Sequence, residues 1–180
     1  MRQGRLIIAA LIALPLAFAA AVAQATVVAA AETGFTIVTE VDVTVSPAVA
    51  YRALTQGPAN WWDSEHTFGG DAARLTLDPR AGGCFCEQMD GGGSVSHGTV
   101  IYADPGQMLR LSSALGPLQQ MAVTGVLSFG FAPRPFGAHV TLTYRVYGGF
   151  TTDAVELSKL VDSVLGAQLQ RFAAHVGRKE

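Results

Sequence analysis

The last long stretch of the chain, residues 153–176, repeats apolar side chains at three- and four-residue intervals. This spacing predicts an α-helix with one apolar face and one polar face. The apolar positions are Leu157, Leu160, Val161, Val164, Leu165, Leu169, Phe172 and Val176. Asp153 and Glu156 have the spacing of a capping box, which indicates that the helix begins at this aspartate. Because such a helix gains most of its stability by burying its apolar face, we expect it to lie across a sheet.

Seven other segments have the apolar–polar alternation, or the apolar runs bounded by turns, that are typical of β-strands. They cover residues 35–45, 74–78, 83–89, 94–103, 107–114, 121–132 and 138–148. The last six follow one another through short links rich in Gly, Pro and Asp, and such links join antiparallel neighbours. The sequence therefore predicts a largely antiparallel sheet with one covered face.

Between the first and second of these strands the sequence predicts two short helices. Ser46 followed by Pro47 is a typical helix start, with serine at the N-cap and proline at the first helical position. Gly57 ends that helix, and residues 59–62 form a second short helical turn. The order of strand, short helices, strands and long helix predicts a single α+β domain over residues 35–176.

The N-terminus has the three parts of a secretory signal peptide. The chain starts with two arginines among its first five residues, residues 6–23 are an uncharged apolar run, and an A-x-A cleavage pattern ends at Ala25. We therefore expect a signal peptide over 1–25, with a second candidate cleavage site after Ala31, and a periplasmic or secreted protein. The alternative is an uncleaved membrane anchor, because the apolar run approaches the length that spans a bilayer.

Charge argues against several classes of partner. The whole chain has 12 Lys and Arg residues and 14 acidic residues, and the leader holds two of the basic ones, so the mature domain is acidic. This balance, without a block of Lys or Arg, excludes typical nucleic-acid binding and stable insertion of the mature domain in a membrane. The sequence has no phosphate-binding loop and no serine nucleophile elbow, and we expect no cofactor.

Several motifs occur together in the order found in a known superfamily. They are a strand that runs into Ser46-Pro47, the Trp61-Trp62 pair, a turn at 78–83 before a strand ending near Glu87, and the terminal helix. With these motifs the chain resembles an exported member of the SRPBCC or START-like superfamily, in its branch of polyketide cyclases and heat-shock ATPase activators. The resemblance implies a helix-grip fold, in which a curved antiparallel sheet of seven strands wraps around the C-terminal helix. It also implies a mostly apolar cavity between sheet and helix.

Cys84, Cys86 and His97 are the sharpest local cluster of reactive residue types. If residues 90–93 form a four-residue hairpin, Cys86 lies directly across from His97, and both thiols point to one face of their strand. Two sulfurs and an imidazole suit zinc or copper, with His66 as a candidate fourth ligand. The sequence thus allows a metal-binding protein as one interpretation.

The same cysteines have other interpretations. Since one residue separates them, we expect poor geometry for a disulfide between Cys84 and Cys86 on a strand. The preferred interpretation is two buried thiols that act as small hydrophobic side chains. A cysteine nucleophile with His97 as its base is less favoured, because Glu87 is expected to point the wrong way to orient the histidine.

We expect the protein to bind a small hydrophobic molecule, such as a lipid, a quinone or a polyketide-like compound, beneath the C-terminal helix. The residues expected to line the cavity are Trp61, Trp62, Phe68, Cys84, Cys86, His97, Phe129, Tyr144, Leu165 and Leu169. A non-catalytic protein is favoured because the sequence lacks a complete catalytic set. The alternatives are the metal-binding protein above and a cyclase- or aromatase-like enzyme, in which His97, with Tyr144 or His66, moves protons.

Overall fold

The computed structural model describes residues 25–177, and the signal peptide predicted for 1–25 lies outside them except for its last residue. The strands are β1 (Ala25–Ala31), β2 (Gly34–Val43), β3 (Leu75–Leu77), β4 (Cys84–Gln88), β5 (Ser94–Asp104), β6 (Met108–Ser112), β7 (Ala122–Arg134) and β8 (Gly137–Gly149). They form one antiparallel sheet in the order β1-β2-β8-β7-β6-β5-β4-β3. Two α-helices, α1 (Pro47–Gln56) and α2 (Ala154–Val176), complete the α+β fold.

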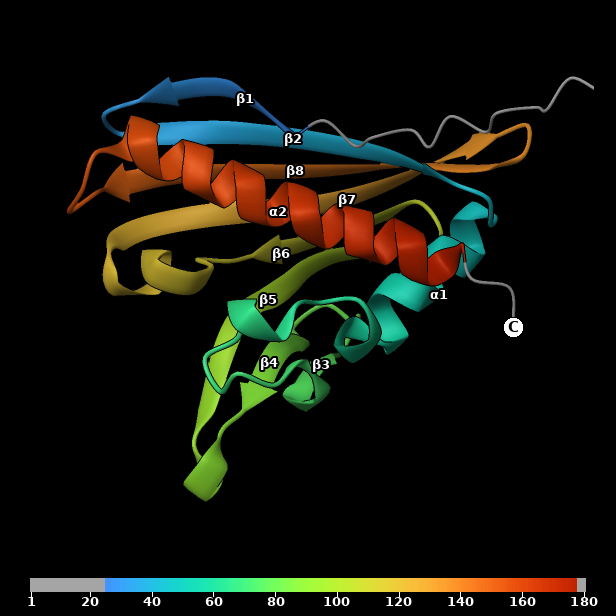
Figure 1. Ribbon diagram of the computed structural model, residues 1–180, viewed down its shortest axis with the longest axis horizontal. Coiled ribbons are helices and arrows are strands. Elements are labelled where there is room, and N and C mark those ends of the chain that lie inside the picture. The colour runs from blue at the N-terminus through green and yellow to red at the C-terminus, as the bar shows by residue number, and fades with distance from the viewer. Residues whose placement is uncertain (1–24, 178–180) are drawn as a thin grey trace, which may run out of the picture.

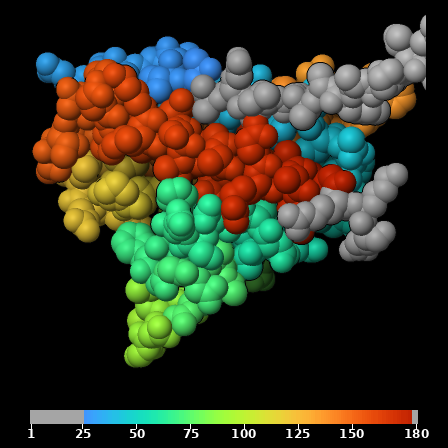
Figure 2. All heavy atoms as spheres, in the orientation of Figure 1, coloured from blue at the N-terminus to red at the C-terminus, as the bar shows by residue number. Residues whose placement is uncertain are grey.

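The long helix α2 crosses one face of the sheet, as the hydrophobic pattern of the sequence predicts. It packs mainly against β2 and β1, and the segment that contains α1 and the following short turns lies beneath its C-terminal half (Figure 1). In the space-filling view the residues after α1 press against the helix from below (Figure 2). Asp153 caps α2, since its carboxylate accepts hydrogen bonds from the N–H groups of Val155 and Glu156 at 2.8 and 3.1 Å.

The sheet has eight strands, so the prediction of seven is wrong. The additional strand is β1, which pairs with β2 from Ala25↔Thr39 to Ala31↔Gly34. Its sequence, ATVVAAA, is apolar except for Thr26 and lacks the alternation of a half-exposed strand, so it cannot be told apart from the end of a leader. Cleavage after Ala25 would leave β1 nearly whole, whereas cleavage after Ala31 would remove it.

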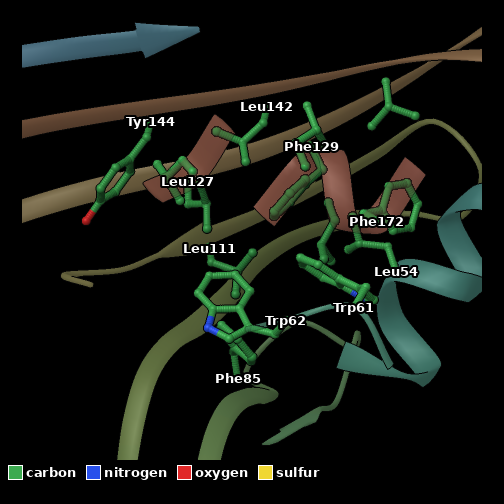
Figure 3. Close-up of a cluster of buried hydrophobic side chains, with 14 of the residues drawn as sticks. Leu54, Trp61, Trp62, Phe85, Leu111, Leu127, Phe129, Leu142, Tyr144 and Phe172 are labelled. Atoms are coloured by element: carbon green, nitrogen blue, oxygen red, sulfur yellow. The ribbon is translucent and has the colours of Figure 1, made fainter. Parts of the chain in front are cut away.

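The core lies between α2 and the concave face of the sheet. Its large side chains come from the middle of β6, β7 and β8, from α1 and α2, and from the tryptophan pair (Figure 3). The labelled members are Leu54, Trp61, Trp62, Phe85, Leu111, Leu127, Phe129, Leu142, Tyr144 and Phe172. Within residues 25–177, neither helix is both long and apolar enough to span a membrane.

Candidate functional site

A cavity of about 370 Å³ lies under the N-terminal half of α2. Its walls come from three parts of the chain: the helix, the segment from Trp62 to Phe68, and the turn that follows β6, with His97 of β5 at the side. The lining residues are Trp62, Glu65, His66, Thr67, Phe68, His97, Leu115, Gly116, Pro117, Leu157, Leu160, Val161, Val164 and Leu165. This volume is within the range of small-molecule sites, and most of the lining is apolar.

The helix contributes its apolar face to this cavity. Leu165 is buried at one end, while Leu160 is 65% exposed at the mouth. Val161 and Val164, which are half-buried, line the cavity between these two leucines. The part of the cavity wall that this half of α2 supplies is therefore entirely aliphatic.

His97 faces the cavity because of a β-bulge. In the pairing of β4 with β5, Phe85 is opposite Gly98 and Cys86 is opposite Ser96, so His97 is the extra residue of the bulge. His97 and Gly98 are consequently both buried, whereas a regular strand would turn one of them outward. The imidazole ring lies between two aromatic rings, 5.1 Å from Phe85 and 5.9 Å from Phe68, measured between ring centroids.

Glu87 forms a hydrogen bond with the imidazole of His97. It is fully buried, and its Oε2 lies 3.0 Å from His97 Nε2. The same carboxylate accepts the backbone N–H groups of Phe68, at 3.0 Å, and Gly69. Glu87 therefore ties the segment beside the cavity to β4 and orients the imidazole at the same time. The prediction that Glu87 points the wrong way is wrong, because the cysteines, and not Phe85 and Glu87, take the outer face of β4.

The environments of the two groups set their charge. Burial alone would raise the pKa of Glu87, but the N–H groups of Phe68 and Gly69, together with His97, outweigh it and lower that pKa. Burial lowers the pKa of His97 below its usual 6.5, and the neighbouring carboxylate opposes this only in part. At neutral pH we therefore expect an ionised Glu87 beside a neutral His97. In that state the imidazole proton belongs on Nε2, where it is donated to Glu87.

Trp62 and Phe68 are the aromatic residues of the cavity wall. The indole Nε1 of Trp62 donates to the carbonyl oxygen of His66 at 3.0 Å, which closes the turn between them. Its ring packs edge-on against Phe85, with the centroids 5.5 Å apart. Phe68 is 46% exposed and lies over the His97 ring, so it forms a partly open side of the cavity.

Tyr144 supports the cavity from within the core. Its hydroxyl accepts the N–H of Leu115 at 3.1 Å and donates to the carbonyl of Ser113 at 3.2 Å. Burial raises the pKa of this phenol to about 12, although the two hydrogen bonds lower it, so the group stays neutral. Tyr144 thus fixes the turn that carries Leu115 and Pro117 to the cavity, without lining it.

Of the ten residues predicted to line the cavity, the structure places four there: Trp62, Phe68, His97 and Leu165. Another four, Trp61, Phe129, Tyr144 and Leu169, are fully part of the packed core. The sequence interpretation missed the cavity residues Leu115 and Pro117, and it missed Glu87 as the partner of His97. The alternation of β4 could have revealed Glu87, since it shares a strand face with the apolar Phe85.

Cys84 and Cys86, the remaining two, lie on the outer face of β4 and form a disulfide with a Cα–Cα distance of 5.4 Å. The preferred interpretation of two buried thiols is therefore wrong, because the cysteines are bonded to each other and are partly exposed, with a Cα–Cα distance in the usual range for bonded cysteines. The hairpin pairs Gln88 with Ser94, one residue away from the predicted register, so Cys86 faces Ser96 and not His97. The structure does not bring the thiols and the imidazole together. Among residues 25–177 there is no group of three or more His, Cys, Asp or Glu side chains that could hold a metal.

No protein-family model and no curated protein matches the sequence. Solved structures do match the fold. Protein MLL2253 from Mesorhizobium loti has a TM-score of 0.58 and 22% identity, over 81% of this chain and 98% of that chain. Protein CV1439 from Chromobacterium violaceum has a TM-score of 0.58 and 19% identity, over 80% and 98% of the two chains. A protein from Rhizobium leguminosarum has a TM-score of 0.57 and 17% identity, over 87% and 99%. At these identities the likeness shows a shared α+β fold and carries no activity with it.

Proposed function

We propose that the protein is an exported START-like protein that binds a small hydrophobic molecule in the cavity beneath α2. The observation that carries this proposal is the cavity of about 370 Å³, whose lining is mostly apolar and contains one buried polar side chain, His97. Binding sites for small molecules combine such an apolar wall with few, fixed polar groups. The assignment to the START-like superfamily is supported by the sequence motifs, together with a curved sheet that packs around a long C-terminal helix.

Export is supported by two independent features. The sequence before β1 has the composition of a secretory leader. The disulfide between Cys84 and Cys86 is of a kind that persists in oxidising compartments outside the cytosol. We therefore place the mature domain in the periplasm or outside the cell.

Ligand binding can be tested with the exported protein, purified under mild conditions. Native mass spectrometry should detect an organic mass that is lost on denaturation. Leu160→Glu should reduce the bound fraction about tenfold, because it places a charge at the apolar mouth of the cavity. The matched control is Val155→Glu, since Val155 is also exposed on α2 and does not line the cavity. A retained mass that is equally abundant in both variants would contradict the proposed site.

A second candidate function is a cyclase-like enzyme that uses the same cavity. The pair formed by Glu87 and His97 favours it, because a carboxylate that orients a neutral histidine is a common arrangement for a general base. In that case the molecule retained by the protein should be converted on incubation, and His97→Ala should stop the conversion while the protein remains folded. Unchanged mass of the retained molecule over repeated incubation would favour binding alone.

A further inference from the structure

We infer that the cavity selects neutral molecules that carry a hydroxyl group on an apolar body, and that Nδ1 of His97 accepts the hydrogen bond of that hydroxyl. This inference rests on the proposed ligand-binding function and adds the chemical class of the ligand. The arrangement of polar groups around the cavity supports it.

The carboxylate of Glu87 fixes which nitrogen of the imidazole carries the proton. Its oxygens already accept the backbone N–H groups of Phe68 and Gly69, and a group that accepts several hydrogen bonds is stabilised in its ionised form. An ionised carboxylate can only accept, so the contact of 3.0 Å with His97 Nε2 requires a hydrogen on that nitrogen. In the neutral ring Nδ1 is then an acceptor with a free lone pair.

Nδ1 is also within reach of a ligand. The ring is almost fully buried, yet no described residue supplies a hydrogen-bond partner for this nitrogen. The buried side-chain atoms without a partner in the described part of the chain are Thr39 Oγ1, Trp61 Nε1, Asp162 Oδ1 and Gln168 Nε2. Nδ1 is not one of them, so it retains contact with open space, and His97 lines the cavity. A buried acceptor of this kind favours a donor over an apolar group.

The other polar groups around the cavity do not compete for this role. Glu65 and His66 are exposed at its rim. The hydroxyl of Thr67 already donates to the carbonyl of Ser64 at 2.8 Å, and the indole N–H of Trp62 is used by His66. His97 is therefore the polar contact at depth.

The charge of Glu87 decides between a hydroxyl and an acid. A ligand carboxylate at His97 would place a second negative charge near a buried carboxylate, in a site whose lining has no Lys or Arg and whose buried imidazole is neutral. Desolvation of that charge would disfavour binding. A phenol-like hydroxyl, whose pKa is near that of tyrosine, about 10, stays neutral at pH 7 and can donate its proton.

The test compares two probes of nearly equal shape, 2-naphthol and 2-methylnaphthalene, by equilibrium dialysis at pH 7 with wild type and His97→Phe. Phenylalanine keeps a ring between Phe68 and Phe85 and leaves Glu87 its two backbone donors, but it removes the acceptor. The preference for naphthol over methylnaphthalene, expressed as the ratio of their Kd values, should fall about tenfold in the variant. Val164→Ala is the matched control, since it widens the cavity for both probes and should leave the ratio unchanged.

The outcomes separate the inference from the function on which it rests. Binding of both probes with the same Kd ratio in wild type and His97→Phe would overturn the inference and leave an apolar binding site intact. Failure of both probes to bind wild type would overturn the proposed function as well. If His97→Phe does not fold, nitrogen NMR of histidine-labelled wild type decides. We expect a proton on Nε2 and an Nδ1 signal that shifts with naphthol only, and a proton on Nδ1 would overturn the inference.

Discussion

The two halves of α2 cover the same sheet but enclose different interiors. Under the C-terminal half, Phe172 packs edge-on against Trp61 with ring centroids 5.6 Å apart, and the void left among Leu54, Trp61, Phe129 and their neighbours is only about 10 Å³. Under the N-terminal half, the cavity of about 370 Å³ remains. The C-terminal half of the helix covers a packed core, and the N-terminal half covers the cavity.

The difference follows from which side chains the chain supplies at each end. The packed half receives the large rings of Trp61 and Phe172, which fill space efficiently (Figure 3). The open half has Val161 and Val164 on the lining face of the helix, and β5 contributes the smaller ring of His97 at the side of the cavity. A single amphipathic pattern thus supports stability at one end and leaves room for a ligand at the other.

The largest expected effect comes from opening the packed half. Phe172→Ala removes a fully buried ring and should lower the free energy of unfolding by about 3–5 kcal/mol. Urea denaturation measures this loss. Because Phe172 does not line the cavity, the affinity for naphthalene-type probes should change less than twofold under conditions where the variant remains folded. A parallel loss of affinity in the folded variant would show that the two halves are not independent.

The sequence predicts most of this fold. The apolar period of residues 153–176 predicts α2 to within one residue at its start, and the turns rich in Gly, Pro and Asp locate all strands from β3 to β8. The strand β1 escapes prediction because an apolar segment without alternation fits both a leader and an edge strand. The period of apolar and polar residues predicts a helix or strand only where one of its faces packs on the core and the other is in contact with water.

The site is less predictable, because it depends on register. A bulge at His97 and a pairing of Gln88 with Ser94 decide that the histidine meets Glu87 and that the cysteines turn away. Neither feature has a sequence signal strong enough to fix a shift of one residue. Likewise, the sequence pattern predicts that Tyr144 and Leu169 are buried. Only the structure shows that they pack in the core and do not line the cavity.

A smaller effect is expected from the buried pair at the open half. Glu87→Gln keeps the shape of the side chain but puts an amide N–H where a carboxylate oxygen accepts a backbone N–H, so the free energy of unfolding should fall by about 1–3 kcal/mol at pH 7. Urea denaturation of wild type and variant gives the difference. A variant as stable as wild type would show that Glu87 does not tie Phe68 and Gly69 to β4.

The pH dependence of stability gives a second measure of the same pair. Folding lowers the pKa of both His97 and Glu87, so in each case the unfolded chain binds more protons, and stability is lost as pH falls. The contribution of His97 is complete above its usual pKa of 6.5 and declines below it. That of Glu87 is complete above 4.5 and is lost at lower pH. Glu87→Gln should remove the second decline, and an unchanged acid profile would contradict the assignment.

The smallest effect on stability should come from filling the open half. Val164→Phe adds a ring to the wall of the cavity, where the space of about 370 Å³ can take it without overpacking. The free energy of unfolding should change by less than about 1 kcal/mol, or rise slightly, because the new ring buries apolar area. Binding of both naphthalene probes should weaken at least tenfold, since the ring occupies the volume they need. Val155→Phe, on the exposed face of the same helix, is the control and should leave binding unchanged. If Val164→Phe were instead as destabilising as Phe172→Ala, the open half of α2 would be a tightly packed core like the other half, and the contrast between them would fail.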